Sequence, residues 1–200
     1  MSDRLIALIA GASGSGKSHL ARLTGWPVLR LDDFYRDGTT PGLPRGANGQ
    51  IDWDDVATWD GAAALAALQA LSATGRATVP VYDIAANAAA GQRTIEAGDA
   101  PAIVAEGIFA THLLAACRAQ GLPVIAIWLD RGRWPTWWRR LRRDIRQHRK
   151  PPAVLWRRGI ALCRAEPALR QAGLAAGFTA MTMRQARHAL RQAALTGKNR

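Results

Sequence analysis

The chain has 200 residues, 48% of them apolar, and a formal net charge of +12. This length and composition predict a single domain with a sizeable core. No apolar run approaches the ~18–20 residues that cross a bilayer, and the N-terminal stretch containing Asp3 and Arg4 is too short for a signal peptide. We therefore expect a soluble, cytoplasmic protein without a membrane partner.

The charge is unevenly distributed along the chain. Residues 1–130 hold 9 basic and 13 acidic residues, whereas residues 131–200 hold 18 and 2. Such asymmetry is compatible with a nucleic acid, an anionic membrane surface or a polyanionic small substrate. The two cysteines, Cys117 and Cys163, lack metal-ligand spacing, so we expect reduced thiols.

The first motif in chain order is a glycine-rich loop. An apolar run over residues 4–10 predicts a strand, residues 11–18 read G-A-S-G-S-G-K-S, and a helix-forming run follows. The backbone N–H groups of such a loop and the N-terminus of the next helix bind phosphate. Lys17 would reach the β- and γ-phosphates, and the Ser18 hydroxyl would bind Mg²⁺. The predicted nucleotide-binding residues are Gly11, Ala12, Ser13, Gly14, Ser15, Gly16, Lys17 and Ser18.

Acidic residues follow two of the predicted strands. Residues 28–31 read as a strand that ends in Asp32 and Asp33, and residues 101–105 read as a buried strand that ends in Glu106. Ligands bind at the carboxyl ends of strands in open parallel sheets. Asp32 can accept a substrate hydroxyl proton, and Glu106 can hold Mg²⁺ or its waters. The alternatives are an acidic turn or helix cap for Asp32 and a surface acid for Glu106.

The middle of the chain adds a second acidic cluster. A Gly/Pro-rich loop over residues 36–50 leads to residues 51–60, where carboxylates alternate with Trp53 and Trp59. This mixture suits a sugar or a base, but a capped helix start with inward-facing tryptophans is the alternative. A helix is predicted over 58–72. Residues 78–83 contain Pro80, which favours an edge strand or an extended segment, and Tyr82 could line a pocket.

The rest of the chain continues the alternation of helices and strands. A helix over 108–119 precedes a buried strand over 123–130, and further helices are predicted over 154–165, 167–176 and 183–194. This order predicts an α/β fold: a parallel sheet with helices on both faces. The arginine-rich residues 139–150 would form a lid that closes on the phosphates. A solvated basic helix and a nucleic-acid-binding helix are the alternatives.

Together these motifs resemble the uridine kinase (uridine–cytidine kinase) family of P-loop kinases, of which this chain would be a divergent, uridine kinase-like member. The resemblance covers most of residues 4–165. The matching segments, in chain order, are residues 11–18 (the P-loop), 32–35 (DDFY against D-S-F-Y), 53–54 and 59–60 (WD and WD against F-D and F-D), 80–83 (PVYD against P-x-Y-D), 105–107 (AEG against E-G) and 139–144 (RRLRRD against R-R-x-x-R-D).

The resemblance implies one P-loop kinase domain over residues 1–200, with the lid at about 131–150 and C-terminal helices over 152–195. It implies that ATP, or another nucleoside triphosphate, and Mg²⁺ are the cofactors. The implied catalytic residues are Asp32, the base on a nucleoside 5′-hydroxyl, with Lys17 and Arg143. The implied substrate-binding residues are Asp32, Tyr35, Trp53, Asp54, Tyr82 and Asn87. Ser18 and Glu106 would serve the metal, and Arg140 and Arg143 would bind the triphosphate or the acceptor.

The chain departs from the family pattern at two places. Asn87 stands where the family has a histidine that reads the pyrimidine base, and the distal lid reads H-R-K in place of R-G-R. We expect transfer of the γ-phosphate to the 5′-hydroxyl of a uridine- or cytidine-like nucleoside. The alternatives are a P-loop kinase for another small hydroxyl-bearing metabolite, such as a pantothenate-like or sugar-phosphate compound, a nucleic-acid-binding P-loop NTPase, and a relative that binds ATP without turnover. We expect a small-molecule partner rather than a nucleic acid, and the sequence leaves homo-oligomerisation open.

Overall fold

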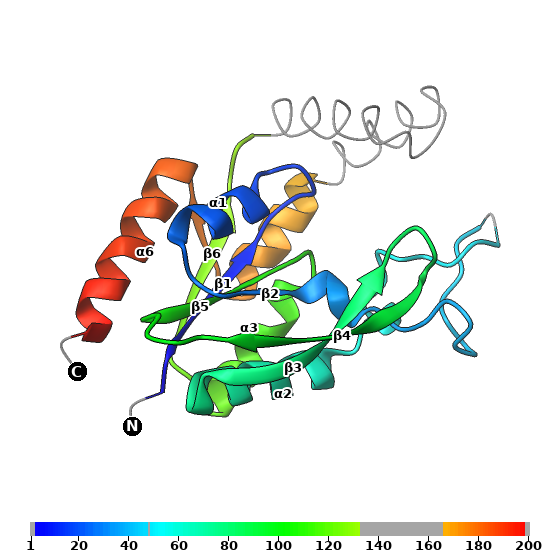
Figure 1. Ribbon diagram of the computed structural model, residues 1–200. Coiled ribbons are helices and arrows are strands. Elements are labelled where there is room, and N and C mark those ends of the chain that lie inside the picture. The colour runs from blue at the N-terminus through cyan, green and yellow to red at the C-terminus, as the bar shows by residue number, and fades with distance from the viewer. Residues whose placement is uncertain (1–2, 48, 133–165, 199–200) are drawn as a thin grey trace.

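The central element of the fold is a five-stranded parallel sheet (Figure 1). The computed structural model describes residues 3–47, 49–132 and 166–198. The strand order is β2-β5-β1-β6-β7, and every neighbouring pair is parallel. The strands, in sheet order, are Val28–Arg30 (β2), Ala102–Glu106 (β5), Leu5–Ala10 (β1), Val124–Leu129 (β6) and Thr179–Met181 (β7). The predicted α/β fold class is therefore confirmed.

Helices cover both faces of this sheet, which explains why its central strands β1 and β6 are apolar throughout. Helices α1 (Lys17–Thr24) and α6 (Met183–Lys198) pack on one face, where Ile9 meets Leu20 and Leu190 in one buried cluster. Helices α2 (Gly61–Thr74) and α3 (Ala110–Ala119) pack on the other, in the cluster that contains Leu8. Successive β1 side chains thus alternate between two cores, as strand geometry requires.

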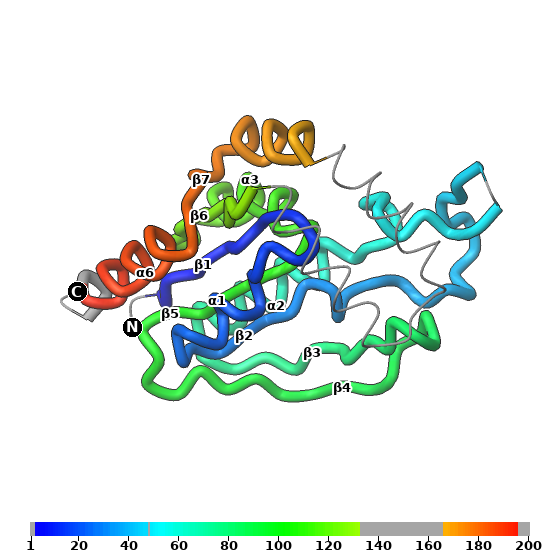
Figure 2. Tube along the Cα trace, turned by 90° about the horizontal axis from the view of Figure 1, so that it is seen from above, coloured from blue at the N-terminus to red at the C-terminus, as the bar shows by residue number. Residues whose placement is uncertain are grey.

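A two-stranded antiparallel hairpin stands apart from the main sheet. It consists of β3 (Arg76–Asp83) and β4 (Ala88–Glu96), and Figure 2 shows it running along the β2 side of the molecule. Val79 and Ile95 are buried and anchor the hairpin to the core beneath it. Pro80 therefore lies in a hairpin strand outside the main sheet, in agreement with the predicted edge position.

Several elements differ from the sequence predictions or lie outside the described residues. Strand β7 was not predicted, and two short 3₁₀ turns, η1 (Leu31–Phe34) and η2 (Val56–Thr58), lie before and after the Gly/Pro-rich loop over residues 36–50. The helix predicted over 167–176 spans 166–175. Of the predicted lid, only residues 131–132 fall within the described ranges. None of the helices in the described part of the chain has the length and apolar character of a membrane-spanning segment.

Candidate active site

The P-loop joins the end of β1 to the start of α1. Gly11, Gly14 and Gly16 all have positive φ angles, which glycine adopts at little steric cost. Lys17 is buried, and its Nζ donates to the carbonyl oxygens of Gly11 at 2.8 Å and Ala12 at 3.2 Å. The lysine is thus held against its own loop, at the N-terminus of α1, where the helix dipole favours an anion.

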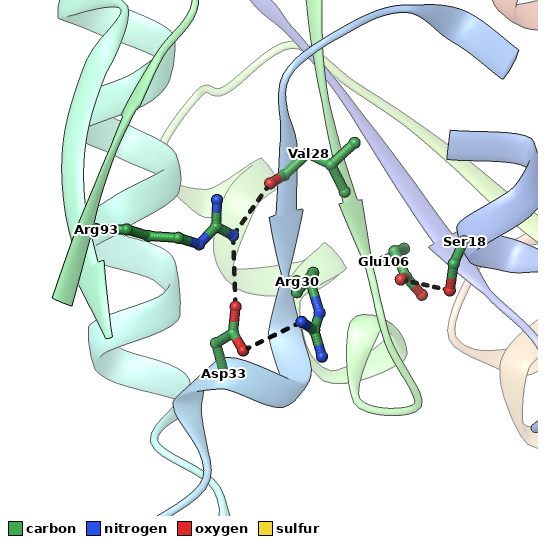
Figure 3. Close-up of polar contacts among 6 residues, drawn as sticks. All are labelled: Ser18, Val28, Arg30, Asp33, Arg93 and Glu106. Atoms are coloured by element: carbon green, nitrogen blue, oxygen red, sulfur yellow. Dashed lines mark hydrogen bonds and ion pairs between the residues drawn. The ribbon is translucent and has the colours of Figure 1, made fainter. Parts of the chain in front are cut away.

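Ser18 and Glu106, the two predicted metal-binding residues, lie next to each other. The Ser18 hydroxyl donates to Glu106 Oε1 at 2.8 Å (Figure 3). The sheet register produces this contact, because Glu106 pairs with Ile9 on β1, just before the P-loop. A hydroxyl and a carboxylate are hard oxygen ligands of the kind that Mg²⁺ takes together with phosphate oxygens and water. Their chemistry fits the predicted ion, and the described residues hold no cluster of three or more His, Cys, Asp or Glu side chains suited to a metal.

Asp32 lies in η1, directly after β2. Its Oδ1 is buried and has no hydrogen-bond partner among the described residues. Burial raises the pKa of the Asp32 carboxyl, the negative charge of Glu106 raises it further, and the positive charges of Lys17 and Arg30 oppose this shift. A buried carboxylate oxygen with no hydrogen-bond partner costs folding free energy, so its presence points to a function. The raised pKa also brings this carboxyl group closer to the working range of a general base.

The residue after Glu106 makes room for Asp32. A Cβ on Gly107 would lie 2.7 Å from Leu31 Cβ and 3.1 Å from Asp32 Oδ1, both closer than ordinary contact. Only a residue without a side chain therefore lets the ends of β5 and β2 approach this closely. Both residues of the E-G pair thus have a structural reason: Glu106 contacts Ser18, and Gly107 leaves room for Asp32.

Three of the predicted substrate-binding residues form an aromatic group. The ring of Tyr35 lies 5.5 Å from Trp53 and 5.6 Å from Tyr82, centroid to centroid, and the Tyr35 hydroxyl donates to the Trp53 carbonyl at 3.0 Å. Phe109, which the sequence analysis did not single out, lies 5.7 Å from Tyr35. Burial, and to a smaller extent the charge of Asp37, raises the pKa of Tyr82 to about 12. The rings are tilted against one another, with Tyr35 and Trp53 edge to face at 90°, and make an uncharged aromatic cluster at neutral pH.

The acidic segment combines the two interpretations left open by the sequence. Asp55 and Asp60 act as caps, accepting from the Ala57 and Ala63 N–H groups, and the Trp59 indole is buried with its Nε1 donating to Leu31 O at 2.8 Å. This half is the capped helix start with an inward tryptophan. Trp53, by contrast, is half-buried against the tyrosines, and Asp54 follows it on the exposed surface.

Asn87 serves the backbone of the hairpin turn. Its φ is +52°, in the left-handed region that asparagine tolerates better than most residues, and its carbonyl accepts from the Gly38 N–H at 2.8 Å. A Cβ on Gly38 would approach both Asn87 and Trp53. The turn therefore closes against the loop near the aromatic group, and base reading by the Asn87 side chain stays a prediction.

A hollow lies beside the P-loop and was not predicted from the sequence. It has a volume of about 510 Å³ and is formed by the ends of β6 and β7, the start of α6 and helix 166–175. A Cβ on Gly16 would lie 3.3 Å from Met183 Cε and 3.7 Å from Arg131 Cζ, two residues that line it. Asp130 accepts from Arg170 Nε at 2.7 Å at its edge, and this bond is the main reason that the pKa of Asp130 is lowered. The sequence signal that could have indicated this hollow is Asp130, which ends a predicted strand. Strand β7 gave no such signal.

The remaining predicted site residues, Arg140 and Arg143, lie outside the described residues. The structure therefore brings together Lys17, Ser18, Glu106 and Asp32 at one sheet edge, and Tyr35, Trp53 and Tyr82 in one aromatic group.

Comparison with known proteins gives structural matches only. No protein-family model matches the sequence, and no curated protein sequence does. A solved structure from Silicibacter sp. TM1040, named "putative fructose transport system kinase", matches with a TM-score of 0.58 and 21% identity over 90% of this chain and 89% of that one. A "possible uridine kinase" from Bacillus stearothermophilus gives a TM-score of 0.49 and 21% identity, over 85% and 86% of the two chains. The YGR205w protein gives 0.45 and 15%, over 85% and 78%. The first of these likenesses shows the fold alone, a parallel α/β sheet flanked by helices.

Proposed function

Since the chain has this fold, we propose that the protein is a kinase. It would move the γ-phosphate of ATP, or of another nucleoside triphosphate, to a hydroxyl group of a small neutral acceptor. The acceptor we favour is a nucleoside, phosphorylated at its 5′-hydroxyl. One observation carries the proposal: the buried Oδ1 of Asp32, which has no hydrogen-bond partner within residues 3–47, 49–132 and 166–198, lies at the same sheet edge as the P-loop and the Ser18–Glu106 pair. Phosphoryl transfer needs these parts, namely a phosphate-binding loop, oxygen ligands for a metal, and a group that receives the acceptor proton.

The triphosphate side of the reaction is assigned to the P-loop. Its N–H groups and the Lys17 ammonium would hold the β- and γ-phosphates, and the hollow lined by Arg131 and Met183 would take the base. Ser18 and Glu106 would hold Mg²⁺, which when bound neutralises the charge of the transferring phosphoryl group. Arg140 and Arg143, carried over from the family resemblance, would add positive charge from the lid.

The acceptor side is assigned to Asp32 and the aromatic group. Asp32 would accept the hydroxyl proton and hold that oxygen in line with the γ-phosphate. The half-buried rings of Tyr35 and Trp53 would contact a nucleobase, with the buried ring of Tyr82 beside them, and Asp54 would take ribose hydroxyls. A neutral acceptor fits better than a phosphorylated one, because both Arg30 and Arg93 already pair with Asp33.

A free sugar is the second candidate acceptor. The name of the Silicibacter structure mentions fructose, and an aromatic ring can pack against the apolar face of a sugar as well as against a base. Asn87 in place of a base-reading histidine also leaves the choice between these acceptors to experiment.

The test is ADP release by the purified protein with MgATP and a panel of acceptors: uridine, cytidine, adenosine, guanosine and fructose. We expect turnover with a nucleoside, loss of at least about 10²-fold in Asp32→Asn, and no loss in Asp55→Asn, since asparagine still caps η2. Turnover with fructose alone would identify a sugar kinase. No stimulation by any acceptor, together with steeply salt-dependent binding to RNA or DNA, would refute the proposal in favour of a nucleic-acid-binding NTPase.

A further inference from the structure

The carboxylate next to Asp32 is buried between two arginines. The Asp33 side chain is only 2% exposed, and its Oδ2 lies 3.4 Å from Arg93 Nη2 and its Oδ1 3.9 Å from Arg30 Nη1 (Figure 3). A buried carboxylate keeps its charge only when cations lie close to it. The two arginines thus make a charged Asp33 tolerable at this depth.

Arg93 comes from a different part of the chain. It lies on β4 of the hairpin, whose strands form no hydrogen-bonded ladder with the main sheet. Besides Asp33, its Nη2 donates to the carbonyl oxygen of Val28 at 3.5 Å, at the start of β2. One guanidinium group therefore contacts both the beginning of β2 and the turn that follows this strand, as Figure 3 shows.

This contact joins the two halves of the acceptor site. The turn η1 carries Asp32, whereas the hairpin carries Tyr82, whose hydroxyl donates to Arg36 O at 3.3 Å. The family pattern quoted above has serine at the position of Asp33, so the second carboxylate is a feature of this chain. A serine is neutral and would not need, or attract, an arginine from the hairpin.

We propose that Arg93 and Asp33 are positioning residues: their ion pair fixes the hairpin against the catalytic turn and so sets the distance between Tyr82 of the aromatic group and Asp32. This inference rests on the proposed kinase function for its effect on the acceptor, but the pair's effect on the turn can be measured without any turnover. Loss of the pair loosens the acceptor site and leaves the triphosphate site intact, because the P-loop makes its contacts through β1, α1 and β5.

The experiment compares Arg93→Met with Arg76→Met in the full chain. Arg76 is the matched control, because it pairs with Glu96 at 3.7 Å on the same hairpin but both side chains are about two-thirds exposed (69% and 67%). The first measurement is hydrogen–deuterium exchange of residues 31–34 and 79–82. We expect faster exchange in both segments for Arg93→Met, unchanged exchange in η1 for Arg76→Met, and partial recovery in Arg93→Lys. Unchanged exchange in η1 of Arg93→Met would overturn the proposal, whether or not the protein turns over.

The second measurement is the kinetics with uridine and MgATP. Since a displacement of about 1 Å at a reacting group has large effects, we expect Arg93→Met to raise KM for uridine about tenfold and to leave KM for ATP within about twofold. The double variant Asp33→Ser, Arg93→Met removes the uncompensated buried charge, so it melts closer to the wild type while KM for uridine stays raised. Recovery of the wild-type KM in the double variant would show that only charge burial mattered and would overturn the proposal. Wild-type protein without any kinase turnover refutes the proposed function instead, and the exchange result still decides on the ion pair.

Discussion

Replacing Gly107 by alanine is expected to displace Asp32 and slow phosphoryl transfer. The new Cβ would lie 2.7 Å from Leu31 Cβ and 3.1 Å from Asp32 Oδ1. Carbon atoms pack at about 3.5–4.0 Å, so the end of β5 and the η1 turn must separate by about 0.8 Å or more. Overpacking of this kind costs about 1–3 kcal/mol of unfolding free energy, and a displacement near 1 Å at a reacting group can cost about 10²-fold in rate.

The assay for Gly107→Ala is a urea titration combined with kcat from ADP release. Gly121→Ala is the control: its φ is +68° and nothing lies within 4 Å of its Cβ, so it carries a backbone cost of about 1 kcal/mol without moving the site. We expect both variants to lose stability and only Gly107→Ala to lose kcat. A Gly107→Ala variant with lowered stability and unchanged kcat would refute the argument that Gly107 positions Asp32.

Three further predictions concern single titratable groups. Because burial raises the pKa of Asp32, its charge opposes folding at neutral pH. The variant Asp32→Asn should therefore raise the urea midpoint at pH 7 without added Mg²⁺. This gain should vanish below about pH 4, where the carboxyl group is protonated in both the folded and the unfolded state. Because Arg170 lowers the pKa of Asp130, this pair stabilises the fold at pH values above the ordinary aspartate pKa. The urea midpoint of Asp130→Asn should therefore be lower than that of the wild type at pH 7. The two midpoints should match once the pH drops below the lowered pKa. Burial raises the pKa of Cys117 to about 11, so in Cys163→Ser protein a thiol reagent should react only after unfolding, and rapid reaction of the native protein would contradict this burial.

The sequence by itself determined the P-loop and the general fold. Its signals are local: the glycine-lysine pattern of residues 11–18, the buried apolar strand before it, and the carboxylates just after β2 and at the end of β5. In a parallel sheet the carboxyl ends of strands meet at one edge, so Asp32 and Glu106 were expected near Lys17 from chain order alone. The structure agrees, and the contact between Ser18 and Glu106 follows from the register of β1 with β5.

Other features could not be predicted because they depend on contacts between distant segments. The pairing of Asp33 with Arg93 joins residues 60 apart, and no local pattern marks Arg93 within a mostly exposed strand. Similarly, Phe109, at the N-terminus of α3, meets Tyr35, directly after η1, only in the folded chain. The hollow next to the P-loop needs β7, whose three residues are too short to give a periodic signal. The role of the tryptophans also needed the packing, since Trp59 is buried and Trp53 is not.

There is a physical reason why some features could be predicted from the sequence and others needed the tertiary structure. Backbone conformation and strand order are set by short-range preferences, such as glycine in a phosphate-binding loop or apolar runs in a buried strand, and these are written in neighbouring residues. The charge state of a side chain, its burial and its partners depend on which segments fold against it, so two adjacent aspartates with the same sequence signal differ. Both have a buried Oδ1 with no hydrogen-bond partner among the described residues, but Asp33 forms ion pairs with Arg30 and Arg93, whereas burial raises the pKa of Asp32. Only the tertiary structure decided this difference.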